Sequence, residues 1–316
     1  MEKHSKIQFL GKKSPSKLYP IIGLKGKKPM CVYPIFYYAL PFVRYVFSPP
    51  LGTAATYQGP LIADYNTLKQ SKKESYFVDF QSAVDKFMSS QLKVNFTKLR
   101  LPPNFIDSRP LMWNGYSTRP LYDYVIDLTR KLSEIFDSFS KSRRRNIRNT
   151  EESEFVFSEG AIKELDLTFE SVSDRYYSQG IDPEITLAYL HDTYDVLHPA
   201  NLRIFSVNDG ETFLTGSIFL FYKEKAQAWI GSPKTDHRGN YPNDLLLWKC
   251  IQWAKNSGYK KFEITWANTY RLCKYKAKYN PELSQYFSCE KCSPFINFMR
   301  SIKNKIQKDQ RDIFQK

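Results

Sequence analysis

Residues 202–222 read LRIFSVNDGETFLTGSIFLFY, and this stretch decides the fold of the second half of the chain. It contains two β runs, 202–207 and 213–222, on either side of Asn208-Asp-Gly210. An Asp-Gly pair between apolar runs is a strong signal for a hairpin turn. A third β run follows at 226–230. The pattern predicts an antiparallel meander of three strands.

The segments on both sides of this meander complete the prediction. Helical spacing of apolar residues marks 162–177 and 184–197 before it and 244–256 after it. The last of these ends at Gly258, and a glycine just past a helix is the usual stop. A strand is predicted at 260–265. Helices, meander, helix and strand in this order predict a mixed α+β fold with one βα crossover.

The first half of the chain predicts a hairpin, further strands and two helices. The hairpin joins 18–24 to 30–38, and the first helix carries apolar residues from Phe77 to Met88. The remaining elements are strands at 43–47, 96–101, 116–128 and 154–158, a long loop at 48–60, and a helix at 132–139 that extends toward Ile147. We expect domains at 1–150 and 151–290, followed by a basic amphipathic helix at 291–316.

The charge of the chain is strongly basic. Lys and Arg number 47 against 32 Asp and Glu, which gives a formal net charge of +15. Such a balance favours a polyanion or an anionic surface as partner: tRNA, a nucleotide-linked substrate, coenzyme A phosphates or acidic lipid headgroups. Solvated lysines that serve only solubility are the alternative. The basic residues gather in 1–30, 141–148, 271–278 and 300–316.

Neither a membrane span nor a metal site is expected. No stretch approaches the ~18 consecutive apolar residues that a spanning helix needs. The N-terminus shows no apolar signal core, so a cytoplasmic protein is expected. The five cysteines are odd in number, and Cys289, Cys292 and Cys273 have no histidine nearby to complete four zinc ligands. We therefore expect reduced thiols and no metal.

The order meander, loop, helix, strand resembles the fold of GNAT acyl-CoA N-acyltransferases. Residues 236–244, DHRGNYPND, stand where that fold has its pyrophosphate loop, in which backbone N–H groups at a helix N-terminus face a phosphate. Arg238, Gly239 and Asn240 are therefore candidates for binding the donor or a phosphate. Tyr241 and Asn243 stand where that pattern has glycines, and bulky side chains there obstruct a close backbone approach. This departure argues against acetyl-CoA.

Three further segments resemble the Fem-type (FemABX-like) aminoacyl transferases that form peptidoglycan bridges. They are 124–129 followed by 139–148, then 242–258, and the motif Tyr275-Lys-Ala-Lys-Tyr-Asn-Pro281, which matches the family's aromatic-Lys-x-x-aromatic-Gly/Asn pattern. The resemblance covers roughly residues 40–287. It implies tandem GNAT-like domains, of which the first is expected to be incomplete because the family's opening strand and helix are not found.

The resemblance implies transfer of an acyl or aminoacyl group to an amine acceptor. The donor is either an aminoacyl-tRNA or acetyl-CoA or another acyl-CoA, and a non-catalytic tRNA-binding module is the alternative of another class. Lys276 matches the motif lysine, and its ammonium could stabilise an oxyanion or hold a tRNA phosphate. The plain alternative is a surface lysine.

Four arginines and the C-terminal tail have two interpretations each. Arg143, Arg144, Arg145 and Arg148 either bind phosphates at the cleft between the halves or form a solvated helix face. The tail has an apolar stripe from Phe295 to Ile306 that either docks on the core or attaches to an anionic lipid surface. His237 is either a base or a solvated loop residue. Asp123, Asp127 and Tyr177 are polar groups near the cleft and are assigned no role.

Overall fold

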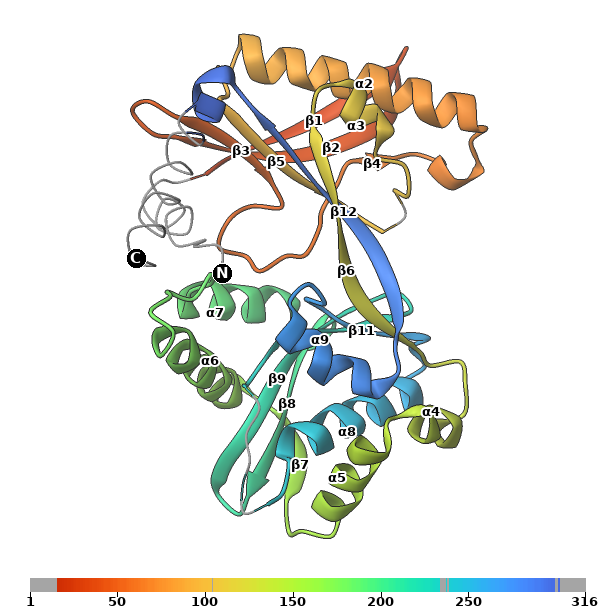
Figure 1. Cartoon of the computed structure of the whole chain (residues 1–316), viewed down its shortest axis with the longest axis vertical. Helices are drawn as coiled ribbons and strands as arrows, with labels where there is room; N and C mark the ends of the chain where they lie inside the picture. The colour runs from red at the N-terminus through yellow and green to blue at the C-terminus, as the bar shows by residue number, and fades with distance from the viewer. Residues whose placement is uncertain (1–15, 104, 234–236, 238, 299–300, 302–316) are drawn as a thin grey trace, which may run out of the picture. The chain divides into compact units, whose positions relative to one another are not determined.

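The computed structural model describes residues 16–298 and 301, apart from residues 104, 234–236 and 238 (Figure 1). The described chain forms two compact units. Unit 1 contains residues 52–54 and 122–285, and unit 2 contains residues 16–51, 55–121 and 286–301. Residue 150, where the sequence suggested a boundary, lies inside unit 1. Of the expected C-terminal helix, Met299, Ile302 and Ile306 lie outside the described residues.

The sheet of unit 1 confirms the predicted meander and crossover. Its strand order is β6-β11-β10-β9-β8-β7. The meander β8-β9-β10 is antiparallel, whereas β10 and β11 are parallel and are joined through α8. The bounds are β6 (Ser117–Asp127, in unit 1 from Tyr122), β7 (Val156–Gly160), β8 (Leu202–Asp209), β9 (Thr212–Tyr222), β10 (Lys225–Gly231) and β11 (Lys261–Ile264).

Helices cover both faces of this sheet (Figure 1). One core lies between the strands and α4, α5 and α8, and includes Ile135, Ile147 and Phe262. A second core lies on α6 and α7, and includes Leu165 and Leu190. The bounds are α4 (Leu132–Ser138), α5 (Lys141–Glu151), α6 (Ile162–Tyr177), α7 (Leu187–Leu197), α8 (Pro242–Asn256), α9 (Tyr270–Lys276) and the 3-10 turn η2 (Ala277–Tyr279).

The helix expected from residue 132 toward Ile147 is two helices. Phe139, at the end of α4, has extended backbone angles (φ −65°, ψ 152°), and so does Ser140. The Ser140 hydroxyl then accepts a hydrogen bond from the Arg143 N–H at 3.3 Å and caps α5. This cap sets the rotation of α5, and therefore which of its arginines point inward.

Unit 2 repeats the motif of a parallel strand pair with a helix crossover. Strands β3 and β5 are parallel and α2 joins them, just as α8 joins β10 and β11. The strand order is β1-β2-β3-β5-β12, and β4 pairs with β2. The bounds are β1 (Lys17–Lys25), β2 (Lys28–Ala39), β3 (Arg44–Ser48), β4 (Leu61–Ile62), the 3-10 turn η1 (Tyr65–Thr67), α2 (Gln70–Ser90), β5 (Phe96–Leu101), α3 (Arg109–Trp113) and β12 (Glu282–Cys292, in unit 2 from Tyr286).

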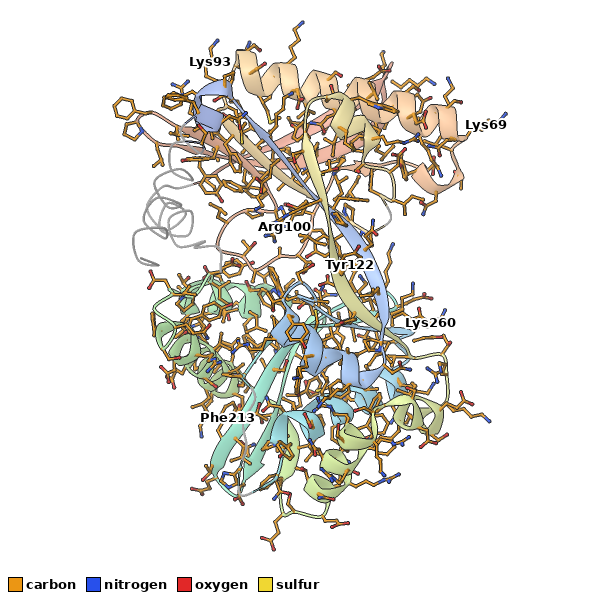
Figure 2. The ribbon with its side chains drawn as sticks, in the orientation of Figure 1. Lys69, Lys93, Arg100, Tyr122, Phe213 and Lys260 are labelled. Carbon is orange, nitrogen blue, oxygen red and sulfur yellow. The ribbon has the colours of Figure 1, made fainter. Side chains whose placement is uncertain are left out.

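The predicted hairpin and first helix are both present in unit 2. Phe77, Phe80, Val84 and Met88 of α2 lie in the core with residues of β1 and β2. Figure 2 shows Lys69 and Lys93 at the two ends of α2. None of the described helices is long and apolar enough to cross a membrane.

Each unit is completed by a strand from the other half of the sequence. Strand β6, from the first half, pairs with β11, and β12, from the end of the chain, pairs with β5. Strand β12 was not predicted. The exchange explains why no single cut near residue 150 separates the units.

Candidate functional site

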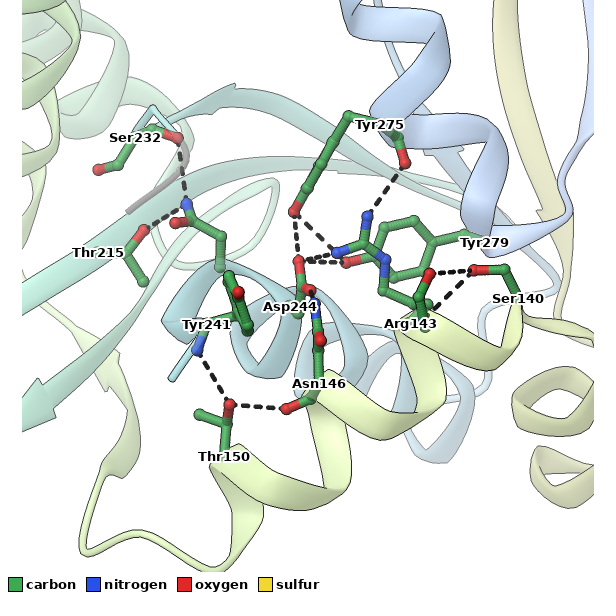
Figure 3. Close-up of polar contacts among 12 residues, drawn as sticks. Ser140, Arg143, Asn146, Thr150, Thr215, Ser232, Tyr241, Asp244, Tyr275 and Tyr279 are labelled. Carbon is green, nitrogen blue, oxygen red and sulfur yellow. Dashed lines mark hydrogen bonds and ion pairs between the residues drawn. The ribbon is translucent and has the colours of Figure 1, made fainter. Parts of the chain in front are cut away.

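A buried ion pair between α5 and α8 stands at the centre of unit 1. The side chain of Arg143 is 3% exposed and that of Asp244 is fully buried, and they form a salt bridge (Figure 3). The other Asp244 oxygen accepts a hydrogen bond from Asn146 Nδ2 at 2.9 Å. Buried charges are tolerated when they are paired and hydrogen-bonded in this way.

Two tyrosines of α9 and η2 complete this cluster. The hydroxyls of Tyr275 and Tyr279 donate to Asp244 Oδ1 at 2.9 Å and 3.4 Å. The Arg143 guanidinium lies over both rings, 4.4 Å and 4.5 Å from their centroids, and donates to the Tyr275 carbonyl at 3.2 Å. Such cation–π contacts are strengthened by burial. Both aromatic positions of the aromatic-Lys-x-x-aromatic motif are therefore fixed by Arg143 and Asp244.

In the sequence Lys276 lies between these two tyrosines, and both tyrosines are fixed by the cluster. The Lys276 ammonium donates to the Thr265 carbonyl, just after β11. Burial lowers the pKa of Lys276 to about 8, and the negative charge of Asp123 partly opposes this shift. Lys276 is thus not a solvated surface lysine. It changes its charge near neutral pH, which an ordinary lysine does not.

Asp123 and Glu263 form a buried carboxyl pair beside this lysine. The Asp123 Oδ1 atom accepts the Trp266 N–H at 2.6 Å, and the Glu263 carboxyl lies within hydrogen-bonding reach. In the described part of the chain, no N–H or O–H donates to Asp123 Oδ2. Burial and the nearby Glu263 raise the pKa of Asp123 from its ordinary 3.8 to about 7. Asp123 therefore keeps part of its protonation at neutral pH.

A second lysine, Lys225, forms an ion pair with Glu263. Lys225 Nζ lies 2.5 Å from Glu263 Oε2. In the row Lys225, Glu263, Asp123, Lys276, the two carboxyl groups thus lie next to each other between two ammonium groups. Sequence reasoning named Asp123 without a role and missed Glu263 and Lys225. The available signal was a glutamate between Phe262 and Ile264 in a strand that is otherwise buried.

The backbone at the N-terminus of α8 already has acceptors within the protein. The N–H groups of His237 and Asn240 donate to each other's carbonyl oxygen at 3.0 Å and 2.9 Å, and Gly239 turns the chain between them with φ 81°. The Tyr241 N–H donates to Thr150 Oγ1 at 3.1 Å (Figure 3). Pro242, the first helical residue, has no N–H.

The next residues of α8 continue this pattern. The N–H groups of Asp244 and Leu245 donate to the Tyr241 carbonyl. The Asn243 side chain turns toward the sheet, where its Nδ2 donates to Thr215 Oγ1 at 2.8 Å. The predicted site residues Gly239 and Asn240 therefore lie in a turn closed on itself, and Arg238 lies outside the described residues.

The four arginines of α5 do not form one group. Arg143 points inward and its charge is committed to Asp244, which differs from the phosphate-binding role expected from sequence. Arg145 and Arg148 are exposed, and Arg144 is half-buried with its guanidinium at the Asp137 carbonyl. Phosphate binding by Arg144, Arg145 and Arg148 stays a prediction.

The cysteines of β12 do not converge on one point. Residues three apart on a strand point to opposite faces. Cys289 accordingly lies in the core under α2, while Cys292 packs against a different cluster that contains Phe47 and Phe96. Within the described ranges, no three His, Cys, Asp or Glu side chains are grouped to hold a metal ion.

Comparisons with known proteins agree with the fold described above. Residues 137–277 match the family model of the acetyltransferase (GNAT) domain. No curated protein matches the chain. Among solved structures, FemX shares 12% identity with a TM-score of 0.61 over 90% of this chain and 92% of that chain.

Two further structures share the fold at similar distance. L-PGS from Bacillus licheniformis has 14% identity and a TM-score of 0.52, over 86% of this chain and 83% of that chain. A tandem GNAT protein from the clavulanic acid biosynthesis pathway has 8% identity and a TM-score of 0.53, over 90% and 86%. The protein is thus an acyltransferase with a GNAT domain, and its fold is that of Fem-like tandem GNAT proteins.

The Arg143–Asp244 pair should be essential to the stability of unit 1. Replacing Arg143 by Gln leaves Asp244 buried without its charge partner, so we expect the free energy of unfolding to fall by about 3–5 kcal/mol. The matched control is Arg145→Gln on the exposed side of α5, which should change it by no more than about 0.5 kcal/mol. Urea denaturation followed by circular dichroism measures both. Equal effects of the two variants would contradict the assignment.

Replacing Asp123 by Asn should stabilise the protein at high pH. A carboxyl group whose pKa is raised to about 7 in the folded state contributes fully only below its ordinary pKa of 3.8. That contribution is lost as the pH rises toward 7. Asn carries no charge, so the melting temperature of the variant should exceed that of the wild type more at pH 8 than at pH 5. A difference independent of pH would show that Asp123 titrates normally.

Proposed function

We propose that this protein transfers an aminoacyl group from an aminoacyl-tRNA to an amine acceptor. The observation that carries the proposal is the occupied backbone at the N-terminus of α8. A coenzyme A pyrophosphate bound in the GNAT manner needs several N–H groups there. In this chain five N–H groups between His237 and Leu245 donate to protein oxygens, and Pro242 has none.

The charge at this helix end also favours a donor other than coenzyme A. Asp244 lies in the first turn of α8 and is buried there. Its carboxylate already occupies the position near a helix N-terminus that favours negative charge. A pyrophosphate would have to approach this carboxylate, and the Arg143 charge that could offset the repulsion is paired with Asp244.

A tRNA donor agrees with the charge of the chain. The net charge is +15, and binding of a nucleic acid backbone depends mainly on Lys and Arg contacts to phosphates. Lys141, Arg145 and Arg148 are exposed on α5, whereas Arg143 is buried. They provide positive charge that is not used in the core.

Lys276 is the proposed catalytic residue for this reaction. The acceptor amine attacks the ester carbonyl of the aminoacyl group, so that a C–N bond forms and the ester C–O bond breaks. The Lys276 ammonium stabilises the oxyanion and donates a proton to the leaving ribose hydroxyl. It then recovers a proton from the attacking nitrogen. A pKa of about 8 suits a group that must both give and take a proton near neutral pH.

Transfer from an acyl-CoA is the second candidate. It is favoured by the GNAT domain match over residues 137–277 and by the geometry of β10. The parallel pairing of β10 with β11 ends at Ala228 and Ile264, while β10 continues to Gly231. Trp229 to Gly231 therefore extend past the end of β11.

The donor can be identified with two labelled substrates. The full chain is incubated with a mixture of amine acceptors and either total tRNA charged with ¹⁴C-labelled amino acids or ¹⁴C-acetyl-CoA. The proposal expects saturable loss of label from tRNA into an amide product and no saturable use of acetyl-CoA. Acetyl-CoA turnover without use of aminoacyl-tRNA would establish the second candidate instead.

Substitution of Lys276 tests the proposed chemistry. Lys276→Met should lower kcat by about 10²–10³-fold, because it removes the charge that stabilises the oxyanion. The matched control is Lys278→Met, which changes an exposed lysine two residues away and should leave kcat within about twofold. Full activity of Lys276→Met would contradict the role.

The pH profile gives a second test of Lys276. Its pKa is lowered to about 8, so the active ammonium is lost as the pH rises through that value and kcat should fall. Lys276→Arg keeps its charge at high pH, so the residual activity of this variant should show no fall between pH 8 and pH 9.5. A wild-type profile that rises steadily to pH 9.5 would show that the neutral amine is the active form.

A further inference from the structure

The β1–β2 hairpin has one face covered by α2 and one face turned to solvent. On the covered face, a Cβ atom at Gly23 would lie 2.8 Å from the Phe80 ring of α2, and the Tyr33 ring packs 6.2 Å from that of Phe80. Successive residues of a strand alternate between faces. The side chains of Ile22 and Val32, next to Gly23 and Tyr33 in their strands, therefore point away from α2.

This outer face carries a continuous aliphatic strip. The strand register places Ile22 opposite Val32, and Val32 opposite Leu61 of β4. These three side chains are 55%, 39% and 56% exposed, and Leu18 and Leu24 extend the strip along β1 at 49% and 61%. Single exposed apolar residues are ordinary, but a contiguous group on one sheet face indicates an interaction surface.

Positive charge lies next to this strip, and the local sequence has no negative charge to balance it. Lys27 lies in the hairpin turn and Lys28, opposite Lys25, begins β2, and both are exposed. From residue 16 to residue 63 the sequence has four lysines and one arginine but neither Asp nor Glu. Two of the lysines contact aromatic rings on the α2 side: Lys25 donates to the Tyr76 hydroxyl at 2.8 Å and Lys17 lies over Tyr19.

We propose that this surface docks on an anionic lipid bilayer. We define the hairpin face as Leu18, Ile22, Leu24, Val32 and Leu61, together with Lys27 and Lys28. Aliphatic side chains that enter the headgroup region, next to lysines that meet anionic headgroups, are the features of a peripheral membrane site. The inference does not depend on the proposed reaction.

Other occupants fit the hairpin face less well. A nucleic acid is held by stacking on exposed aromatic rings and by cations along its path. The five exposed large apolar side chains of this face are aliphatic, and the Phe36 ring, opposite Leu18, is only partly exposed. A second copy would bring two positively charged turns together. Addition of a partner strand to the edge strand β1 is hindered because Pro20, in its middle, has no N–H.

Vesicle sedimentation of the full chain tests the proposal. With vesicles of phosphatidylglycerol and phosphatidylcholine, the protein should bind far more strongly than with phosphatidylcholine alone. The double substitution Lys27→Gln, Lys28→Gln should weaken binding about 30-fold, because each lysine near an anionic surface contributes about fivefold. Ile22→Asp and, as a second variant at a peripheral position, Leu61→Ser should each weaken it by about tenfold or more.

Matched controls separate the hairpin face from general charge and exposure. Val196→Asp replaces an even more accessible apolar residue on α7, which is 80% exposed, and Lys223→Gln removes an exposed lysine in the β9–β10 turn. Neither should change vesicle binding. Circular dichroism melting identifies any variant that fails to fold. If either Ile22→Asp or Leu61→Ser fails to fold, the other variant decides the result.

Two results would overturn the proposal. If the hairpin-face variants bind vesicles as tightly as the controls, a different basic segment makes the contact. If sedimentation velocity shows a dimer that Ile22→Asp dissociates while vesicle binding is unchanged, the hairpin face joins two copies of the chain instead.

Discussion

The buried ion pair between Arg143 and Asp244 is the interaction on which the arrangement of unit 1 depends. It joins α5 to α8, and the two tyrosines that surround it bring α9 and η2 to the same point. Lys276 lies between those tyrosines in the sequence, so the position of its ammonium depends on Asp244 and on Arg143, which is more than a hundred positions earlier in the chain. This gives the aromatic-Lys-x-x-aromatic motif a physical reason, because each aromatic ring stacks on Arg143 and each hydroxyl reaches Asp244.

The same carboxylate links the core to the choice of donor. Asp244 is both the partner of Arg143 and the anion in the first turn of α8. At this helix end five N–H groups between His237 and Leu245 already donate within the protein, and the Asp244 carboxylate offsets the positive end of the helix dipole. The buried Asp244 carboxylate therefore accounts both for the fixed position of Lys276 and for the proposed preference for aminoacyl-tRNA.

The sequence predicted most of the elements but not how the two halves exchange strands. Local signals located the meander, the α8 crossover and the β1–β2 hairpin, because alternation and turn residues act over short distances. Strand β12 was not predicted, because its partner β5 lies almost two hundred residues away in the sequence. Arg143 was misplaced with the exposed arginines, although the spacing Arg143, Ile147, Thr150 puts it on the buried stripe of α5. In a run of basic residues, a buried arginine is recognised only if helix periodicity is applied to the charged residues as well as to the apolar ones.

The most direct test of this account is the pKa of Lys276 itself, measured by NMR on protein with ¹³C-labelled lysine. The account predicts a single lysine that titrates near pH 8 in the wild type, because burial lowers its pKa. Asp244→Asn weakens the contacts of Tyr275 and Tyr279 that hold α9 and η2 in place. In this variant the pKa of Lys276 should move toward the ordinary value of about 10.4. A Lys276 that already titrates at its ordinary value in the wild type would contradict the claim that this ammonium is buried and held by the Arg143–Asp244 cluster.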